Sequence, residues 1–154
     1  MKQFFTLMIL MASCFAASSQ GLVISQVYGA GGNAGATYQA DFVELFNQTT
    51  SPISLSGYSV QYASAAGTSW TKSDLLSLNV YSGQYFLLQM STAGANGIAL
   101  PTPDAIATPQ IAMSATAGKV ALVNSTTALS GTQCPPPFVA SIVDYVGYGS
   151  TANC

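Results

Sequence analysis

The distribution of apolar residues constrains this chain most strongly, because they occur in short runs separated by clusters of Gly, Pro, Asn and Ser. No window repeats apolar residues at the 3.6-residue period of an amphipathic helix. Short apolar or alternating runs between turn residues are typical of β-strands. The sequence therefore predicts an all-β domain over residues 21–154, and about seven to nine strands with this spacing indicate a sandwich or barrel.

The expected strands follow from these runs and their flanking turn residues. We predict strands over residues 21–28, 41–47, 53–55, 58–62, 69–71, 84–90, 119–124 and 140–148. The segments 53–55 and 58–62 are predicted to form either a strand pair or one strand with a bulge at Gly57. Residues 91–109 are predicted to be a long irregular connection, and residues 74–77 are the one candidate for a short helical turn.

Charged residues make up only 5% of the chain, and there is no histidine. The absence of histidine excludes a His-based catalytic triad and a His-ligated metal site. The only basic residues are Lys2, Lys72 and Lys119, and the net charge is −2. Phosphate recognition normally needs clustered Arg and Lys, so direct nucleic-acid binding is not expected. We therefore predict a protein that is not an enzyme, with no cofactor and no metal.

The first twenty residues have the layout of a secretory signal peptide. Lys2 precedes an apolar run over residues 4–12, and small residues follow at positions 16–19. This run is shorter than the roughly 20 residues that span a bilayer. We expect cleavage between Ser18 and Gly21 and a secreted, extracellular protein. Two alternatives are a buried N-terminal strand or helix, and a cell-surface lipoprotein, because residues 11–14 resemble a lipobox with Cys14 as the lipidated residue.

Removal of the leader would leave two cysteines, Cys134 and Cys154. Two cysteines in an oxidising compartment most simply form a disulfide. We therefore predict a Cys134–Cys154 disulfide, which would close a loop of about 20 residues and contribute about 3 kcal/mol. The alternatives are two free thiols, or pairing of Cys154 with another chain.

The glycine-rich segment 29–35 is the first candidate for a functional loop. It lacks the Lys and Ser/Thr of a phosphate-binding loop, and a strand rather than a helix is expected after it. We predict a flexible connection between strands, with recognition through exposed backbone as an alternative. Phosphate binding is not expected.

Asp41 and Glu44 are the only closely spaced acidic residues. Residues three apart in a strand point to opposite faces, so this pair does not form the two-carboxylate site of a glycosidase. We expect Asp41 to be a turn residue at the start of its strand. Glu44 is expected to be partly buried and bonded to backbone amides or to lysine. A calcium site formed by Asp41, Asp144 and loop carbonyls is an alternative.

Tyrosines and the single tryptophan suggest two interpretations. In an alternating β pattern, aromatic residues usually fill the core or cover a sheet. The alternative is a sugar-binding platform that includes Trp70, with carbohydrate as ligand. Asn47 and Asn124 lie in glycosylation sequons, but their simpler role is to end a strand with a side-chain turn.

Several segments resemble the lamin-tail domain family, in order along nearly the whole mature chain. The resemblance is most specific in Glu44-Leu45-Phe46-Asn47 followed by Leu55-Ser56-Gly57, so we assign Glu44, Asn47 and Gly57 to a structural motif. Other similar segments are residues 22–28, 52–60, 118–126 and 142–148. Gln26 departs from the family, which commonly has Glu at this position.

The resemblance implies an immunoglobulin-like β-sandwich and a non-catalytic interaction or targeting module. Its partner would be an unknown protein or a cell-surface ligand. Bacterial members are secreted, and they often lie at the N-terminus of extracellular nucleases of the endonuclease/exonuclease/phosphatase type. One alternative is therefore the N-terminal accessory domain of such a nuclease. Another is a structural protein of the cell envelope.

Overall fold

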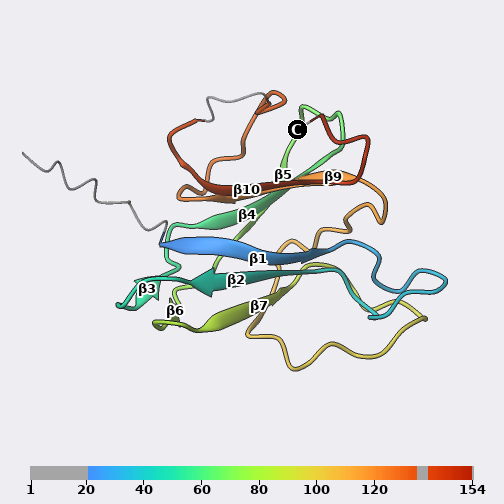
Figure 1. The fold of residues 1–154 in the computed structure, drawn as a ribbon, viewed down its shortest axis with the longest axis horizontal. Helices are drawn as coiled ribbons and strands as arrows, with labels where there is room; N and C mark the ends of the chain where they lie inside the picture. Colours follow the sequence, from blue (N-terminus) through green and yellow to red (C-terminus); the bar gives the residue numbers. More distant parts are fainter. Residues whose placement is uncertain (1–20, 135–138, 154) are drawn as a thin grey trace, which may run out of the picture.

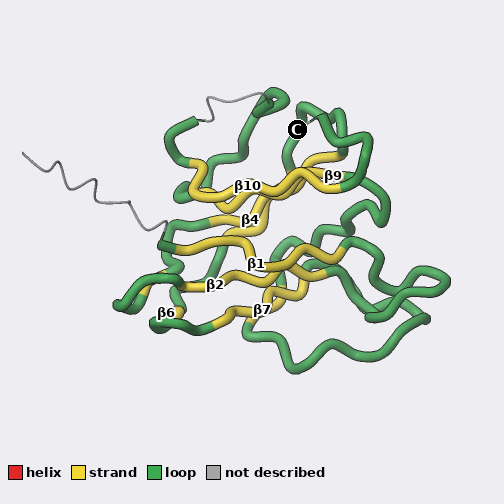
Figure 2. Tube along the Cα trace, in the orientation of Figure 1, coloured by secondary structure: helices red, strands yellow, loops and turns green. Residues whose placement is uncertain are grey.

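The structure is a computed structural model that describes residues 21–134 and 139–153. These residues form ten strands joined by loops, without a helix (Figures 1 and 2). The strands are β1 (Leu22–Tyr28), β2 (Phe42–Asn47), β3 (Ile53–Ser54), β4 (Ser59–Ser64), β5 (Thr71–Asp74), β6 (Asn79–Val80), β7 (Tyr85–Gln89), β8 (Ala105–Ile106), β9 (Gly118–Val123) and β10 (Ile142–Tyr148).

Two four-stranded sheets make up the immunoglobulin-like sandwich. One has the strand order β1-β2-β7-β8 and the other has the order β10-β9-β4-β5, while β3 and β6 form a small separate pair. All pairs are antiparallel except β7 and β8, which run parallel. In Figure 1 the strands β10, β9 and β4 lie above β1, β2 and β7. The all-β sandwich predicted from the sequence is confirmed.

The main core lies between the two sheets and follows from strand alternation. Val43 and Leu45 of β2 are fully buried, whereas Glu44 between them points to the outer face. The opposite sheet contributes Val60, Val120 and Leu122 to the same cluster. Burial of these apolar side chains supplies the main driving force for packing the sheets.

A second, smaller core covers the outer face of the β9 sheet. Ala121 and Val123 of β9 pack there with Trp70 and Leu129. Every residue of β9 is therefore buried, on one face against the main core and on the other beneath the segment that leads to β10. This explains why the sequence of β9 is almost continuously apolar rather than alternating.

One edge of the sandwich is closed by a side chain rather than by a strand pair. β1 and β10 each carry a bulge, between Ile24 and Gln26 and between Ile142 and Asp144. The backbone N–H of Ile24 donates to Oδ2 of Asp144 at 2.7 Å. This carboxylate joins the two sheets and satisfies a backbone donor next to the bulge.

The structure confirms most predicted strands and corrects several details. β1, β2, β7 and β10 lie within the predicted runs, and β9 begins and ends one residue before its predicted run of 119–124. The predicted pairing of residues 53–55 with 58–62 is wrong, because β3 pairs with β6 whereas β4 lies between β5 and β9. The helical turn at 74–77 is also wrong, since these residues leave β5 and bend toward β6.

Two further segments differ from expectation. The short strand predicted at 69–71 is shifted, since β5 begins at Thr71 and Ser69 forms only an isolated bridge to Ser130. The irregular segment 91–109 contains β8, which adds to the edge of the β7 sheet. The fold thus uses a short parallel strand that no periodicity in the sequence indicates.

Some predictions concern residues that the structure does not describe. The signal peptide of residues 1–20, the lipidation of Cys14 and the position of Cys154 lie outside the described residues. Within residues 21–134 and 139–153, no helix is long and apolar enough to cross a bilayer.

Candidate functional site

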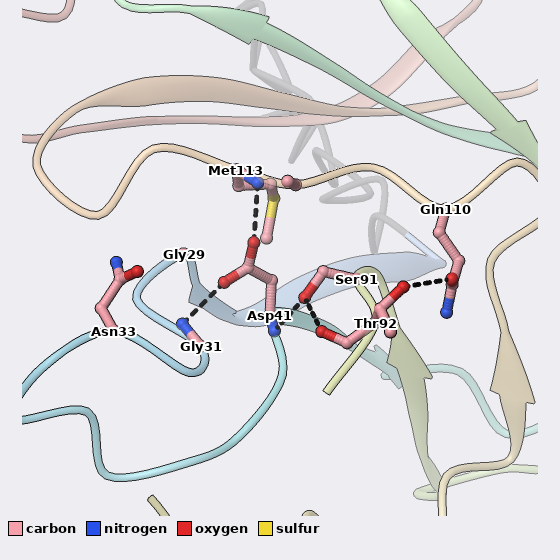
Figure 3. A pocket seen from close by; sticks show the side chains of 9 residues that line it. Gly29, Gly31, Asn33, Asp41, Ser91, Thr92, Gln110 and Met113 are labelled. Atoms are coloured by element: carbon pink, nitrogen blue, oxygen red, sulfur yellow. Dashed lines mark hydrogen bonds between the residues drawn. The ribbon is translucent and has the colours of Figure 1, made fainter. Parts of the chain in front are cut away.

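A polar cleft of about 310 Å³ opens at the end of the sandwich where β1 ends and β2 begins. Three chain segments meet there, as Figure 3 shows: the glycine-rich loop after β1, the residues after β7, and the approach to β9. The cleft is lined by Gly29, Gly31, Asn33, Asp41, Ser91, Thr92, Gln110, Ala112 and Met113. Its position among inter-strand loops is typical of recognition sites on sandwich folds.

Asp41 lies at the centre of this cleft and is only 3% exposed. One carboxylate oxygen accepts the N–H of Gly31 at 2.8 Å, and the other accepts the N–H of Met113 at 2.7 Å. Its own N–H donates to the hydroxyl of Ser91 at 2.8 Å. Asp41 therefore ties together all three segments that build the cleft, and it directly precedes β2, which begins at Phe42.

Burial raises the pKa of the Asp41 carboxyl above its usual range, because desolvation disfavours the charged form. The hydrogen bonds from Met113 and Gly31 act in the opposite direction and partly offset this effect. Both oxygens already accept a backbone donor, so the group is occupied as a tether. This arrangement suits a structural carboxylate better than a proton-transfer group.

The glycine-rich loop is closely packed at Gly29, Gly31 and Gly32, whereas a Cβ at Gly35 would meet nothing within 4 Å. A side chain at Gly31 would place its Cβ 2.1 Å from the backbone of Ala40, and one at Gly29 would meet Ser114 O at 2.4 Å. Gly32 bridges to Asn96, whose side-chain amide donates to the carbonyl of Gly32 at 3.0 Å. The glycines are needed here for close backbone approach.

The rim of the cleft offers neutral hydrogen-bonding groups. Asn33, Thr92 and Gln110 are exposed. The hydroxyl of Thr92 donates to Oε1 of Gln110 at 2.8 Å. This bond uses the amide oxygen of Gln110 and not its NH₂ group. No lysine lines the cleft, and its one carboxylate would repel an anion. The chemistry fits a neutral polar ligand rather than a phosphate.

Asp144 does not join Asp41 in a cation site. Its Oδ2 accepts the N–H of Ile24 and its Oδ1 accepts the N–H of Tyr145 at 2.8 Å, so both oxygens hold backbone donors. Among the described residues, no group of three or more His, Cys, Asp or Glu side chains is placed to hold a metal. The calcium site considered from the sequence therefore has no ligand cluster to support it.

Glu44 is partly buried as predicted, but its partner is different. It accepts the hydroxyl of Ser25 at 2.6 Å, not a backbone amide or lysine. Ser25 is the extra residue at the bulge of β1, where the register shifts between Ile24 and Gln26. The sequence alone did not show this contact, because a bulge has no simple periodic signal.

Asn47 ends β2 and holds the following turn. Its side-chain amide donates to the carbonyls of Ser51 and Val80, both at 2.8 Å. Its Oδ1 accepts the N–H of Thr49 at 2.8 Å and the hydroxyl of Thr49 at 2.7 Å. The predicted side-chain turn is confirmed, and the second carbonyl joins β2 to β6. Asn124, in the other sequon, is exposed.

Gly57 occupies the third position of a tight turn between β3 and β4. The N–H of Tyr58 donates to the carbonyl of Leu55 at 3.0 Å, and Gly57 has a φ of +83°. This left-handed conformation favours glycine over residues with a Cβ. Gly57 is therefore a turn residue, and no bulge within one strand is formed there.

Trp70 belongs to the second core, as the favoured interpretation of the aromatic residues predicted, and it does not form the alternative sugar-binding platform. Its side chain is 7% exposed, and its indole N–H donates to the carbonyl of Gly131 at 2.9 Å. Its ring packs edge-on against Tyr145 with centroids 6.0 Å apart. A buried indole cannot stack on a ligand, so the core interpretation of the aromatic residues holds at this position.

Sequence reasoning missed the role of Lys119, which is completely buried in β9. Its ammonium donates to the carbonyls of Gly67 and Thr132, at 2.7 and 3.1 Å, and to Oδ1 of Asn153 at 3.1 Å. It also lies 5.5 Å from the centre of the Trp70 ring. Burial lowers the pKa of Lys119. All these partners are remote in sequence, so no local pattern could have revealed them.

Of the two cysteines in the predicted disulfide, the structure describes Cys134. Cys134 Sγ lies 3.1 Å from the carbonyl oxygen of Asn153. Its predicted partner, Cys154, lies outside the described residues, and the pairing stays a prediction.

Two comparisons with known proteins bear on these observations. The model of the family described as Lamin Tail Domain matches residues 16–149, which includes all ten strands. No curated protein matches the chain.

Proposed function

The chain belongs to the lamin tail domain family, and from this premise we propose that it is a secreted, non-catalytic binding module. The family match supports a module of the interaction type. Secretion rests on the composition of residues 1–20, which have the order of a signal peptide.

One observation carries the non-catalytic part of the proposal: most carboxylates and lysines among the described residues are hydrogen-bonded or paired within the chain. Asp41 and Asp144 each bind two backbone N–H groups. Asp104 accepts the N–H of Leu87, and Lys72 pairs with Asp74. Groups bound in this way are poorly placed to transfer protons to a substrate.

We place the recognition surface of this module at the cleft around Asp41. Packed loops hold its walls in position, so binding a ligand would cost little ordering entropy. Its exposed groups are the amides of Asn33 and Gln110 and the hydroxyl of Thr92. Amides and hydroxyls without a cation favour a neutral, hydroxyl-rich ligand, and a carbohydrate of the cell surface has this chemistry.

A glycan array probed with the full chain tests the ligand class. We expect binding that is lost in Asn33→Ala and Gln110→Ala, which leave the Asp41 contacts intact. Gln48→Ala is the matched control, because it removes an exposed residue at the other end of β2. A negative array with folded protein would reject the carbohydrate, and hydrolysis of glycans or nucleic acid by the purified chain would reject a non-catalytic role.

The intact mass of the native protein, measured with and without reductant, tests secretion and processing. A mature chain that starts near Gly21 and is two hydrogens lighter when oxidised would support the signal peptide and a Cys134–Cys154 disulfide. A much larger mass would favour the accessory domain of a nuclease. Retention in the membrane fraction that a Cys14→Ser variant abolishes would instead favour a lipoprotein.

A further inference from the structure

A second surface with different chemistry lies on the outer face of the β1-β2-β7 sheet. The register places Gln26, Glu44 and Leu87 opposite one another on three adjacent strands. These strands lie side by side in the lower half of Figure 1. Because neighbours of Glu44 on its own strand point into the core, this row faces away from it.

Aromatic side chains flank this row on both sides. On one side, Phe46 of β2 and Tyr85 of β7 are paired, with ring centroids 4.5 Å apart. On the other side, Tyr28 stacks on Phe42 with centroids 5.4 Å apart. The carboxylate of Glu44 therefore lies on a strand between two groups of aromatic rings.

The segment after β7 turns this face into a groove. Leu100 and Pro101 stand over the sheet and, with Tyr38, complete a groove of about 160 Å³ whose other walls are Gln26, Phe42, Glu44 and Leu87. Tyr38 packs edge-on against Phe42 with centroids 5.7 Å apart, and it bridges to Ile98. The walls thus combine aliphatic and aromatic side chains with the amide of Gln26 and the carboxylate of Glu44.

No cation of the described chain neutralises that carboxylate. Lys72 pairs with Asp74 on the other sheet, and Lys119 is enclosed in the second core. Glu44 instead receives the hydroxyl of Ser25. A hydroxyl satisfies one acceptor site but does not neutralise the negative charge.

We propose that this groove binds a lysine or arginine side chain from an extended segment of a partner protein. The aliphatic stem of such a side chain would lie along Leu87, Leu100 and Pro101, and its charged end would meet Glu44 beside the aromatic rings. Tyr85 is 55% exposed and Ile98 is 64% exposed, so the groove borders apolar surface that residues next to the basic side chain can cover.

A bound sugar is less consistent with this geometry. Phe42 is buried, and Tyr28 covers one of its faces, so the Phe42 ring is not open for a sugar to stack on. A side chain with an aliphatic stem and a charged tip can contact Leu87 and Leu100 while its tip pairs with Glu44. The groove is also separate from the cleft around Asp41, with which it shares no lining residue.

Peptide titration followed by NMR tests the proposal on the full chain. The probes are two pentapeptides, Ala-Ala-Lys-Ala-Ala and the same peptide with norleucine in place of lysine. We expect saturable shifts of the Gln26, Glu44 and Leu87 amides with the lysine peptide, and binding about tenfold weaker with norleucine, since norleucine keeps the stem but loses the charge. Equal binding of both peptides, or no shifts with either, would overturn the proposal.

Substitutions test whether the lysine peptide binds through Glu44. Glu44→Gln is expected to weaken binding of the lysine peptide about tenfold, whereas Asp74→Asn removes an equal charge from the other sheet and should leave it unchanged. If Glu44→Gln fails to fold, Gln26→Lys serves instead. It places a cation opposite Glu44 at an exposed position and should block binding by the peptide.

The remaining outcomes are equally informative. Binding that persists in Gln26→Lys, or that Asp74→Asn weakens as much as Glu44→Gln does, would reject recognition at Glu44. Sedimentation that shows self-association through Lys72 would mean that a second copy fills the groove, which also rejects the proposal. Asn33→Ala and Gln110→Ala, which should abolish glycan binding, should leave this peptide titration unchanged. Each of the two proposed sites can therefore be rejected without the other.

Discussion

Replacement of Asn47 by alanine is the sharpest test of how the structural motif works. Asn47 is completely buried, and its side chain makes four hydrogen bonds of 2.7–2.8 Å. They hold the turn after β2 and join it to the carbonyl of Val80 in β6. Alanine removes all four at once and leaves carbonyl and N–H groups without their partner.

The size of the effect follows from these bonds. A neutral buried hydrogen bond contributes about 0.5–1.5 kcal/mol net, so four of them amount to about 2–6 kcal/mol. A domain of this kind is stable by about 5–15 kcal/mol, so Asn47→Ala removes a large share of the total. With a urea m-value of about 2 kcal/mol/M, the unfolding midpoint should fall by about 1–3 M.

Urea unfolding of the full chain measures this loss. Asn124→Ala is the matched control, since Asn124 also follows a strand but is exposed, and it should change stability by less than about 0.5 kcal/mol. Asn47→Asp adds a second check. Its carboxylate would face the carbonyls of Ser51 and Val80, so it should be worse than alanine at neutral pH and recover partly in acid. A loss below about 1 kcal/mol in Asn47→Ala would refute this account of the motif.

Three further predictions concern the packed loop, the buried lysine and the second core. Gly31→Ala should lower stability by at least about 1–3 kcal/mol, because its Cβ would lie 2.1 Å from the Ala40 backbone, and an unchanged thermal midpoint would contradict the packing described. Burial lowers the pKa of Lys119 in the folded chain below the ordinary value of 10.5, so the unfolded chain binds this proton more tightly. The free energy of unfolding should therefore rise with pH between the lowered pKa of the folded chain and 10.5. Urea unfolding midpoints measured at increasing pH up to 10.5 should rise for the wild type, and this rise should be absent in Lys119→Met. Trp70→Ala should cost about 3–5 kcal/mol, and iodide should quench the fluorescence of this single tryptophan weakly in the folded chain and strongly after unfolding.

The sequence predicts the strands whose side chains follow a simple pattern. β2 alternates between core and surface, and β9 is buried on both faces, so periodicity and apolar runs identify both. β3, β6 and β8 have two residues each, which is too short for any periodicity. Pairing was the weakest prediction, because adjacency along the chain suggested that β3 pairs with β4, whereas Gly57 turns the chain from one sheet to another.

The candidate site could be predicted only in part, for a related reason. The position of Asp41 at the start of β2 follows from local sequence, but its bonds to Gly31 and Met113 depend on how the sheets bring three segments together. The same holds for Glu44, whose orientation follows from alternation while its aromatic neighbours follow from strand register. Local pattern therefore indicates which way a side chain points, and long-range register decides what it meets.

The scarcity of charge gives each ionisable residue unusual weight in this chain. On a typical protein surface, a partly exposed carboxylate is one of many charged groups, and water solvates it well. Here Asp41 and Asp144 each have two backbone donors, and Asp74 has a lysine. Asp104 accepts one backbone N–H, and Glu44 accepts one serine hydroxyl and lies on a strand between two groups of aromatic rings. Among the described residues, Glu44 thus lines a groove with a serine hydroxyl and no lysine as its partner, and this supports a cation supplied from outside.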